Sequence, residues 1–452
     1  MHDMTKGPIT QHLIKMAVPI AVGMLFQTLY FLIDLYFVSR IGDAAIAGVG
    51  AAGNLTFVVM ALTQVLGVGT VTLIAQAVGR KDPVDANLVF NQSLAIATLC
   101  AIVTMVGGWL AIPPYMHTLG ADAATQAAGI DYLMWYLPGL ALQFASVAMG
   151  SALRGTGIAK PTMFVQMATV VLNAVLAPVL IAGVGSGHPL GVAGAGLATT
   201  ISIGCGVLLL GLYFARLEKF VAFDAKLWAP RLDTWARILR IGLPAGGEFA
   251  LMFVYLAVIY TVIRDFGATA QAGFGIGSRI MQAIFLPAMA LAFATSPVAG
   301  QNVGAGLYDR VRATFRAAAI IGSVIMVVLT LICQIKPEWF VRGFTQDPAV
   351  VAVAAEFLRY ISWNFVASGL IFTCSGMFQA LGNTVPALLS SASRIVTFAL
   401  PVLWLSRQPD FQLHYVWITS MVTVALQAVL SLLLLRGQLQ RRTQPLSAAA
   451  PA

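Results

Sequence analysis

Twelve apolar segments, each long enough to cross a lipid bilayer, dominate the chain of 452 residues. A membrane-spanning helix needs about 20 predominantly apolar residues. Charged residues make up only 10% of the chain, whereas about a quarter is usual in globular domains. The sequence therefore predicts an all-α integral membrane protein with twelve transmembrane helices, at 13–39, 47–78, 91–112, 125–151, 160–182, 190–214, 238–263, 272–302, 312–333, 350–379, 385–406 and 411–435.

The basic residues lie mostly on one side of these predicted spans. Of the 26 Lys and Arg residues, 18 fall on the side of the N-terminus, five on the other face, and three within spans or at their ends, namely Arg279, Arg359 and Arg394. Cytoplasmic connections carry an excess of Lys and Arg, so we expect both termini to be cytoplasmic. The net charge of +9 then reflects topology, and no nucleic-acid partner is expected. The polar N-terminus does not resemble a removable signal peptide.

Residues for metal binding or catalysis are not grouped in any recognisable spacing. The four cysteines lie within predicted spans without a CxxC pair, and the five histidines lie in termini, connections or at a span edge. The string at 48–53 matches GxGxxG, but no strand precedes it, and small residues for close helix packing explain it better. No catalytic triad, P-loop or cofactor site is apparent. We therefore expect no enzyme, and any active transport must use an ion gradient or a separate subunit.

An internal repeat with an offset of 225 residues organises the chain. Pro19 falls on Pro244, Tyr30 on Tyr255, and QAVG at 76–79 on QNVG at 301–304. Six spans separate equivalent helices, so both halves enter the membrane from the same side, as in parallel repeats related by an axis along the membrane normal. This pattern predicts two six-helix lobes that suit alternating access: an N-lobe at 1–214, a cytoplasmic linker at 215–237, a C-lobe at 238–436 and a cytoplasmic tail at 437–452.

Two acids, Asp34 and Glu248, lie well inside predicted spans. A charged residue at the centre of a membrane helix costs about 2.5–3.5 kcal/mol on insertion scales, so such residues usually mark an ion or proton pathway or an internal pair. The alternative is that these acids form buried ion pairs with Arg279 and Arg394, the two arginines well inside spans.

Each acid shares a helix face with a tyrosine. Gln27 and Tyr30 precede Asp34 by seven and four residues, and Tyr255 follows Glu248 by seven, spacings that place each set on one face of a helix. The two tyrosines are repeat mates, although packing or anchoring explains such tyrosines as well as a substrate role does.

The chain resembles the multidrug and toxic compound extrusion (MATE) family over nearly its whole length. The resemblance rests on Pro19, on Asp34 with the following IGDAAIAGVG, on LRGTGIAKPTMFVQMATVVLNAVLAPVLIAG at 153–183, and on its mate FQALGNTVPALL. The resemblance implies a V-shaped exporter with twelve helices, which expels organic cations and other amphipathic compounds in exchange for protons or sodium.

The resemblance also implies a cation or proton site in the N-lobe formed by Asp34, Asn173 and Thr199. Members of the DinF branch, to which the chain is most similar, have a second Asp four residues after the Asn, but this chain has Ala177. Hard cations prefer several oxygen ligands, whereas a proton needs one acceptor. We therefore expect proton coupling through Asp34, with sodium as the alternative ion.

The C-lobe departs from the NorM branch of the family. There an acid follows the helix-7 proline by about eight residues, whereas Glu248 follows Pro244 by four, and no acid follows Glu356 in the helix-10 span. We expect a substrate or second coupling site at Glu248, Gln27, Tyr30 and Tyr255, and a hinge at Pro19.

These observations lead to a hypothesis of secondary active efflux. Asp34 would hold a cationic or amphipathic substrate, and its protonation from outside would alter the helix around Pro19 and release that substrate. We expect a monomer in a bacterial inner membrane, with no metal and no cofactor beyond the proton or sodium gradient. The alternatives are a sodium-coupled antiporter and a flippase for lipid-linked precursors, which would need several cavity Arg or Lys for phosphates.

Overall fold

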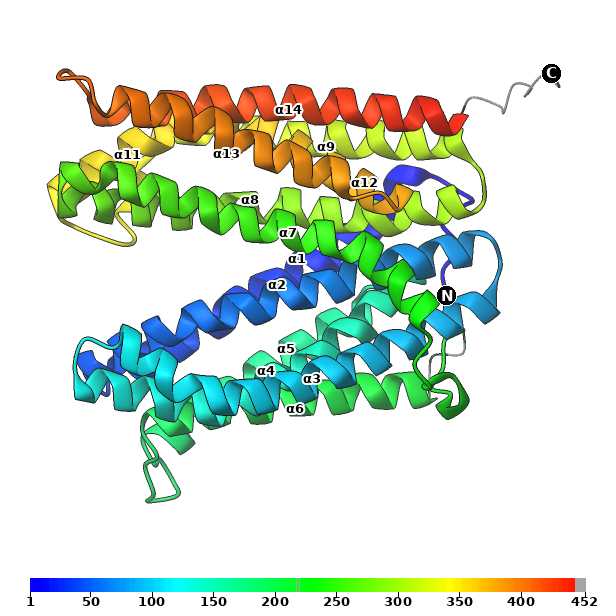
Figure 1. Cartoon of the computed structure of the whole chain (residues 1–452), viewed down its shortest axis with the longest axis horizontal. Helices are drawn as coiled ribbons and strands as arrows, with labels where there is room; N and C mark the ends of the chain where they lie inside the picture. Colours follow the sequence, from blue (N-terminus) through cyan, green and yellow to red (C-terminus); the bar gives the residue numbers. More distant parts are fainter. Residues whose placement is uncertain (217, 219, 444–452) are drawn as a thin grey trace. The chain divides into compact units, whose positions relative to one another are not determined.

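The computed structural model describes the whole chain except residues 217, 219 and 444–452, so Lys219 and most of the predicted tail lie outside the described residues. It contains twelve helical segments long and apolar enough to cross a membrane, which confirms the predicted number of spans. The long helices, in chain order, are α1 (Ile9–Ser39), α2 (Asp43–Gly79), α3 (Pro83–Leu119), α4 (Ala123–Gly155), α5 (Lys160–Ile181), α6 (Val192–Arg216), α7 (Leu232–Ile263), α8 (Ala268–Gly304), α9 (Tyr308–Ile335), α11 (Pro348–Ile361), α12 (Phe365–Leu381), α13 (Val385–Leu405) and α14 (Leu413–Thr443) (Figure 1).

Helices α11 and α12 together form one span, because the short 3-10 helix η3 (Ser362–Asn364) joins them without leaving the apolar segment. Two further short elements, η1 (Ala225–Leu227) and η2 (Arg264–Phe266), flank α7, and α10 (Glu338–Val341) follows α9. The observed helices extend past several predicted spans. The largest extension is in α3, where Asp82 accepts a hydrogen bond from the backbone N–H of Asp85 and caps the helix.

The helix boundaries follow the predicted offset of 225 residues. Helix α2 shifted by this offset gives the bounds of α8, and the first residues of α3 and α5 shift onto those of α9 and α13. The connections agree as well, since Gly157 and its mate Gly382 both have positive φ, at 85° and 76°. Glycine adopts such a backbone conformation without the steric cost that a Cβ would add. The repeat therefore extends from sequence matches to helix ends and turns.

The chain forms two compact units, whose boundaries differ from those of the two repeats. The first segment of each repeat belongs to the unit formed mainly by the other repeat. Unit 1 consists of Met1–Asp3 and Val18–Gly246, and unit 2 of Met4–Ala17 and Gly247–Ala452. Helix α1 therefore begins in unit 2 and continues in unit 1, whereas α7 begins in unit 1 and continues in unit 2. The two transitions lie within three residues of the repeat mates Pro19 and Pro244.

The linker and the start of α7 are bound to α3 within unit 1. The Asn91 amide donates to the backbone oxygen of Ala222 at 2.9 Å, and its oxygen accepts from the Trp228 indole at 3.0 Å. Gln92 donates to the backbone oxygen of Ala229 at 2.8 Å and accepts from the Trp235 indole at 2.7 Å. Both amide residues are fully buried, and buried polar groups of this kind need such partners.

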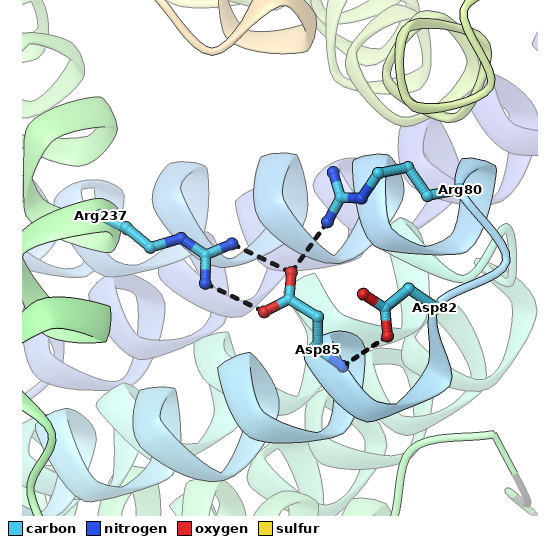
Figure 2. A network of polar contacts seen from close by, with 4 residues as sticks. All are labelled: Arg80, Asp82, Asp85 and Arg237. Atoms are coloured by element: carbon cyan, nitrogen blue, oxygen red, sulfur yellow. Dashed lines mark hydrogen bonds and ion pairs between the residues drawn. The ribbon is translucent and has the colours of Figure 1, made fainter.

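An ion-pair network fixes the first turns of α7 to the first turn of α3 and to Arg80 at the end of α2 (Figure 2). The Asp85 carboxylate accepts two hydrogen bonds from the Arg237 guanidinium, at 2.9 and 3.0 Å, and a third from Arg80 at 2.8 Å. This two-point geometry is the stronger form of an Arg–carboxylate pair. It holds the part of α7 before Gly246 in unit 1.

Gly48, the first glycine of the GxGxxG string, allows close contact between α2 and α4. A Cβ at Gly48 would lie 2.7 Å from the backbone nitrogen of Gly129 and 2.8 Å from the carbonyl oxygen of Thr125. Gly50 and Gly53 have no such neighbour within 4 Å. The string lies inside a helix, so the prediction of a packing role is confirmed at Gly48.

The segment that precedes α1 is held in unit 2 by the end of α8 and the first turn of α9. The backbone N–H of Met4 donates to the side-chain oxygen of Gln301 at 2.8 Å. Asn302 and Arg310 both donate to the carbonyl oxygen of Met4, at 3.3 and 3.2 Å, and Arg310 also donates to that of Gly7 at 3.0 Å. Gln301 belongs to the repeated QNVG segment, so this motif binds backbone rather than substrate.

Candidate functional site

Unit 1 brings Asp34, Asn173 and Thr199 together from α1, α5 and α6. The Asn173 amide donates to Oδ1 of Asp34 at 2.8 Å, and the Thr199 hydroxyl donates to Oδ2 at 3.0 Å. All three residues are buried, with Asp34 8% exposed. The arrangement agrees with the set that the family resemblance implied. Its role in coupling stays a prediction.

The Thr199 hydroxyl has two partners. Its oxygen also lies 3.0 Å from the backbone oxygen of Ala195, one turn earlier in α6. A hydroxyl has one proton to donate and can accept as well. When Asp34 is ionised, Thr199 can donate to it. When Asp34 is protonated, the carboxyl can donate to Thr199, which then donates to Ala195.

The other side of the site contains an amide oxygen without a partner. Oδ1 of Asn173 is buried and has no hydrogen bond among the residues that the structure describes. Ala177, one turn later in α5, is fully buried and adds no oxygen ligand. The side chains of the site therefore offer one carboxylate, one amide oxygen and one hydroxyl.

Tyr30 lies close to this site, whereas Gln27 does not join it. The Tyr30 hydroxyl donates to the backbone oxygen of Thr199 at 3.2 Å. Gln27 is exposed, and its side chain forms no hydrogen bond within the described part of the chain. The shared helix face predicted for Gln27, Tyr30 and Asp34 thus brings only the tyrosine to the acid.

Glu248 occupies a separate place in unit 2. The Ser375 hydroxyl on α12 lies 3.0 Å from one Glu248 carboxylate oxygen and 3.3 Å from the other. Glu248 forms no ion pair with any described residue. Tyr255 lies seven residues later, about 10 Å along α7, so the two residues do not share one contact site.

Tyr255 is anchored on both sides. Its hydroxyl lies 2.6 Å from the Ser420 hydroxyl on α14, and the Arg394 guanidinium carbon lies 4.0 Å above its ring. Among the described residues, neither Arg394 nor Arg279 forms an ion pair. The alternative interpretation, in which these arginines neutralise Asp34 and Glu248, is therefore not supported.

Several neighbours of the acids were not identified from the sequence. Tyr132 and Tyr136 on α4 are buried, pack with ring centroids 5.4 Å apart at an interplanar angle of 47° and interact electrostatically with Asp34. Ser375 and Ser420 in unit 2 were also missed. A tyrosine pair at a spacing of four is a detectable pattern on one helix face, but a single serine in an apolar helix gives almost no signal.

The repeat counterpart of the Asp34 site in unit 2 is apolar. The offset places Ile259 at the position of Asp34 and Phe398 at that of Asn173, and both are buried. The tyrosine is retained, since Tyr30 and Tyr255 both hydrogen-bond to the sixth helix of their repeat. The two units therefore share a scaffold, but within the described part of the chain only unit 1 has the acid with its amide and hydroxyl partners.

Comparisons with known proteins agree with this architecture. The chain is 28% identical over 423 residues to the probable multidrug resistance protein YpnP of Bacillus subtilis, covering 92% of this chain and 91% of the relative. It is 26% identical over 456 residues to the multidrug export protein MepA of Staphylococcus aureus, covering 98% and 97%. It is also 23% identical over 408 residues to a protein of Shewanella oneidensis named FAD transporter, covering 89% of each.

Solved structures show the same fold. A MOP superfamily transporter from Pyrococcus furiosus, whose structure is described as having a binding pocket of reverse polarity, aligns with a TM-score of 0.91 at 24% identity, covering 98% of each chain. An outward-facing multidrug resistance MATE transporter aligns with the same TM-score, identity and coverage.

The family model named MatE matches residues 19–179 and 244–405. These two matches start at the repeat mates Pro19 and Pro244, cover more than half of the chain and include one segment of each repeat. The chain therefore belongs to the MatE family of membrane transporters.

Proposed function

We propose that this protein is a multidrug exporter of a bacterial inner membrane, which expels cationic or amphipathic compounds in exchange for protons. The observation that carries the proposal is the Asp34 carboxylate, buried in unit 1 between Asn173 and Thr199 without an ion-pair partner among the described residues. An intramembrane acid without a fixed counter-charge is suited to bind a mobile cation or a proton.

The proposed cycle uses the two charge states of Asp34. In the ionised state, Asp34 attracts a cationic substrate and is held by the amide of Asn173 and the hydroxyl of Thr199. Protonation from the outside removes that charge, and Thr199 can turn its hydroxyl proton towards Ala195. The substrate loses its counter-charge and is released, while α1 adjusts near Pro19, where a proline interrupts the hydrogen bonds of the helix.

Sodium is the second candidate for the coupling ion, because the unpartnered oxygen of Asn173 could serve as a cation ligand. Protons remain the preferred ion in our proposal. Hard cations prefer several oxygen ligands with carboxylates among them, and Ala177 stands where a second carboxylate would complete the set. We propose that the protein works as a monomer with both termini in the cytoplasm.

Efflux of ethidium from proteoliposomes tests the proposal. Purified protein is reconstituted, and efflux is driven in turn by a pH gradient and by a sodium gradient, with Asp34→Asn and Glu248→Gln assayed beside the unmodified protein. We expect efflux to follow the pH gradient and to fail in Asp34→Asn at unchanged protein incorporation.

Dependence on sodium and on Glu248 would instead move coupling to unit 2. Absence of efflux under both gradients would overturn the drug-exporter proposal and favour a flippase for lipid-linked precursors.

A further inference from the structure

Arg394 is a charged residue in the middle of a membrane helix. It lies nine residues after the start of α13 and eleven before its end, about 14 and 16 Å along the axis. At this depth its side chain is far from the lipid headgroups at either end. Intramembrane arginines are rare and usually face the interior of a bundle, where they bind a partner or a substrate.

The face of α13 that carries Arg394 points into unit 2. The exposed apolar residues Leu389, Val396, Leu400 and Leu403 form one stripe along this helix. With 100° between successive residues, Arg394 lies about 150° away from the centre of that stripe. The buried Ser390 and Phe398, by contrast, lie four residues on either side of Arg394 and share its face.

The guanidinium has a fixed position and free donors. It stacks on the Tyr255 ring at 4.0 Å, and the Tyr255 hydroxyl is itself held by Ser420 at 2.6 Å. Within the described residues, the Arg394 side chain forms neither a hydrogen bond nor an ion pair, and its buried Nε has no partner. A buried donor without a partner is costly, so the stacked arginine is prepared for an acceptor.

The surroundings of Arg394 contain further polar groups but no described acid in contact with it. Gln427 on α14 lies 3.4 Å from the Ser391 hydroxyl, and its side-chain oxygen is buried without a partner. The nearest acid along α7 is Glu248, about 10 Å before Tyr255 along the helix axis. Unit 2 thus contains an arginine on α13 and an acid on α7, neither of which forms an ion pair among the described residues.

We propose that Arg394 forms an anion-binding subsite, which accepts the carboxylate or phosphate of an amphipathic substrate that also carries a positive charge. The planar guanidinium can donate two parallel hydrogen bonds to such a group. Tyr255 keeps it oriented by stacking. This inference rests on the proposed export function and assigns recognition of the anionic group of a zwitterionic substrate to one residue of unit 2.

Two rhodamine dyes that differ in one group provide the test. One carries a free carboxylate and is a zwitterion, and the other is its methyl ester and is a cation. Binding of each dye is measured by fluorescence anisotropy with the full chain in nanodiscs of phosphatidylcholine. The variants are Arg394→Gln, Arg394→Lys and, as a matched control, Arg279→Gln, which removes an exposed arginine from α8 of the same unit.

We expect Arg394→Gln to raise the Kd of the carboxylate dye at least about tenfold, the effect of losing hydrogen bonds to a charged group. The Kd of the ester should stay within about twofold. Arg394→Lys should give a smaller loss confined to the carboxylate dye, since it keeps the charge without the planar fork. If Arg394→Gln does not fold, the lysine variant provides the same comparison. Arg279→Gln should leave both Kd values unchanged.

Equal changes for both dyes, or no change, would overturn the subsite and leave Arg394 with a packing role on Tyr255. Repeating the measurement with phosphatidylglycerol in the nanodisc separates substrate from lipid. Displacement of the dye by this lipid would assign the site to an anionic lipid headgroup and overturn the substrate assignment. Failure of the unmodified protein to export even the ester would instead overturn the proposed export function, independently of Arg394.

Discussion

The hydroxyl oxygen of Thr199 lies 3.0 Å from a carboxylate oxygen of Asp34 and at the same distance from the backbone oxygen of Ala195. The contact with Asp34 joins α1 to α6, and the contact with Ala195 closes one turn within α6. A single hydroxyl can therefore satisfy the acid in either charge state without a change in backbone position. A residue with this property is well placed to let a buried carboxylate gain and lose a proton repeatedly.

Replacing this hydroxyl tests its part in transport. Thr199→Val keeps the shape but removes the donor, which leaves the ionised carboxylate with one partner instead of two. Losing a hydrogen bond to a charged group costs about 1.5–3 kcal/mol, so we expect efflux driven by a pH gradient to fall at least about tenfold. Thr199→Ser should retain most of the rate. Equal rates for the valine variant and the unmodified protein would contradict the role given to the hydroxyl.

Adding the missing carboxylate tests why protons are preferred to sodium. In Ala177→Asp, an acid would stand one turn after Asn173, near its unpartnered oxygen. We expect sodium to raise the Tm of this variant and to leave the Tm of the unmodified protein unchanged, because the added carboxylate supplies a further ligand for a hard cation. Potassium at the same ionic strength is the control. A rise in Tm of the unmodified protein with sodium alone would favour sodium coupling.

The Asp85 network should contribute measurably to the stability of unit 1. Asp85→Asn removes the acceptor of Arg80 and Arg237 and leaves two arginines without their partner. We expect a loss of about 1–2 kcal/mol in the free energy of unfolding, since the pairs are partly exposed but share one carboxylate. Denaturation followed by tryptophan fluorescence measures this loss. Asp309→Asn, which removes a fully exposed acid, should have no measurable effect.

Two glycines in α2 provide a matched test of helix packing. Gly48→Ala places a methyl group 2.7 Å from the backbone of Gly129, so α2 and α4 must separate, at a cost of about 1–3 kcal/mol. Gly50→Ala, two residues later, adds a methyl group with no neighbour within 4 Å and should be neutral or stabilise the helix by up to about 1 kcal/mol. Thermal unfolding of both variants gives the comparison. Similar Tm values would mean that α2 and α4 are not tightly packed at Gly48.

The sequence predicted the spans and the repeat well, because both depend on local patterns. Apolar length determines where a helix can cross a membrane, and the offset that joins Pro19 to Pro244 also joins the ends of α2 and α8. The turns of α3 before residue 91 were missed because Asp85 and Asn87 lower the local hydropathy. Asp85 binds Arg237, and the Asn87 side-chain oxygen accepts from the backbone N–H of Ala222, contacts that depend on tertiary structure.

The candidate site was predictable only in part. Asp34 is conspicuous from its charge alone, whereas Asn173 and Thr199 were identified through the family resemblance. Uncharged polar residues in membrane helices often bond only to their own helix, so their presence does not by itself indicate a site. The partners of Glu248 and Tyr255 could not be found in this way, because Ser375 and Ser420 are single serines in apolar segments. The guanidinium of Arg394 has no ion-pair partner because no described acid lies in contact with it. A periodic pattern in the sequence cannot predict such an absence.

The division of α1 and α7 between the two compact units makes each half of the chain incomplete by itself. Each repeat begins with a segment that belongs to the other unit: Met4–Ala17 to unit 2, and the part of α7 up to Gly246 to unit 1. A polypeptide with only one repeat would therefore lack the segment that completes its compact unit.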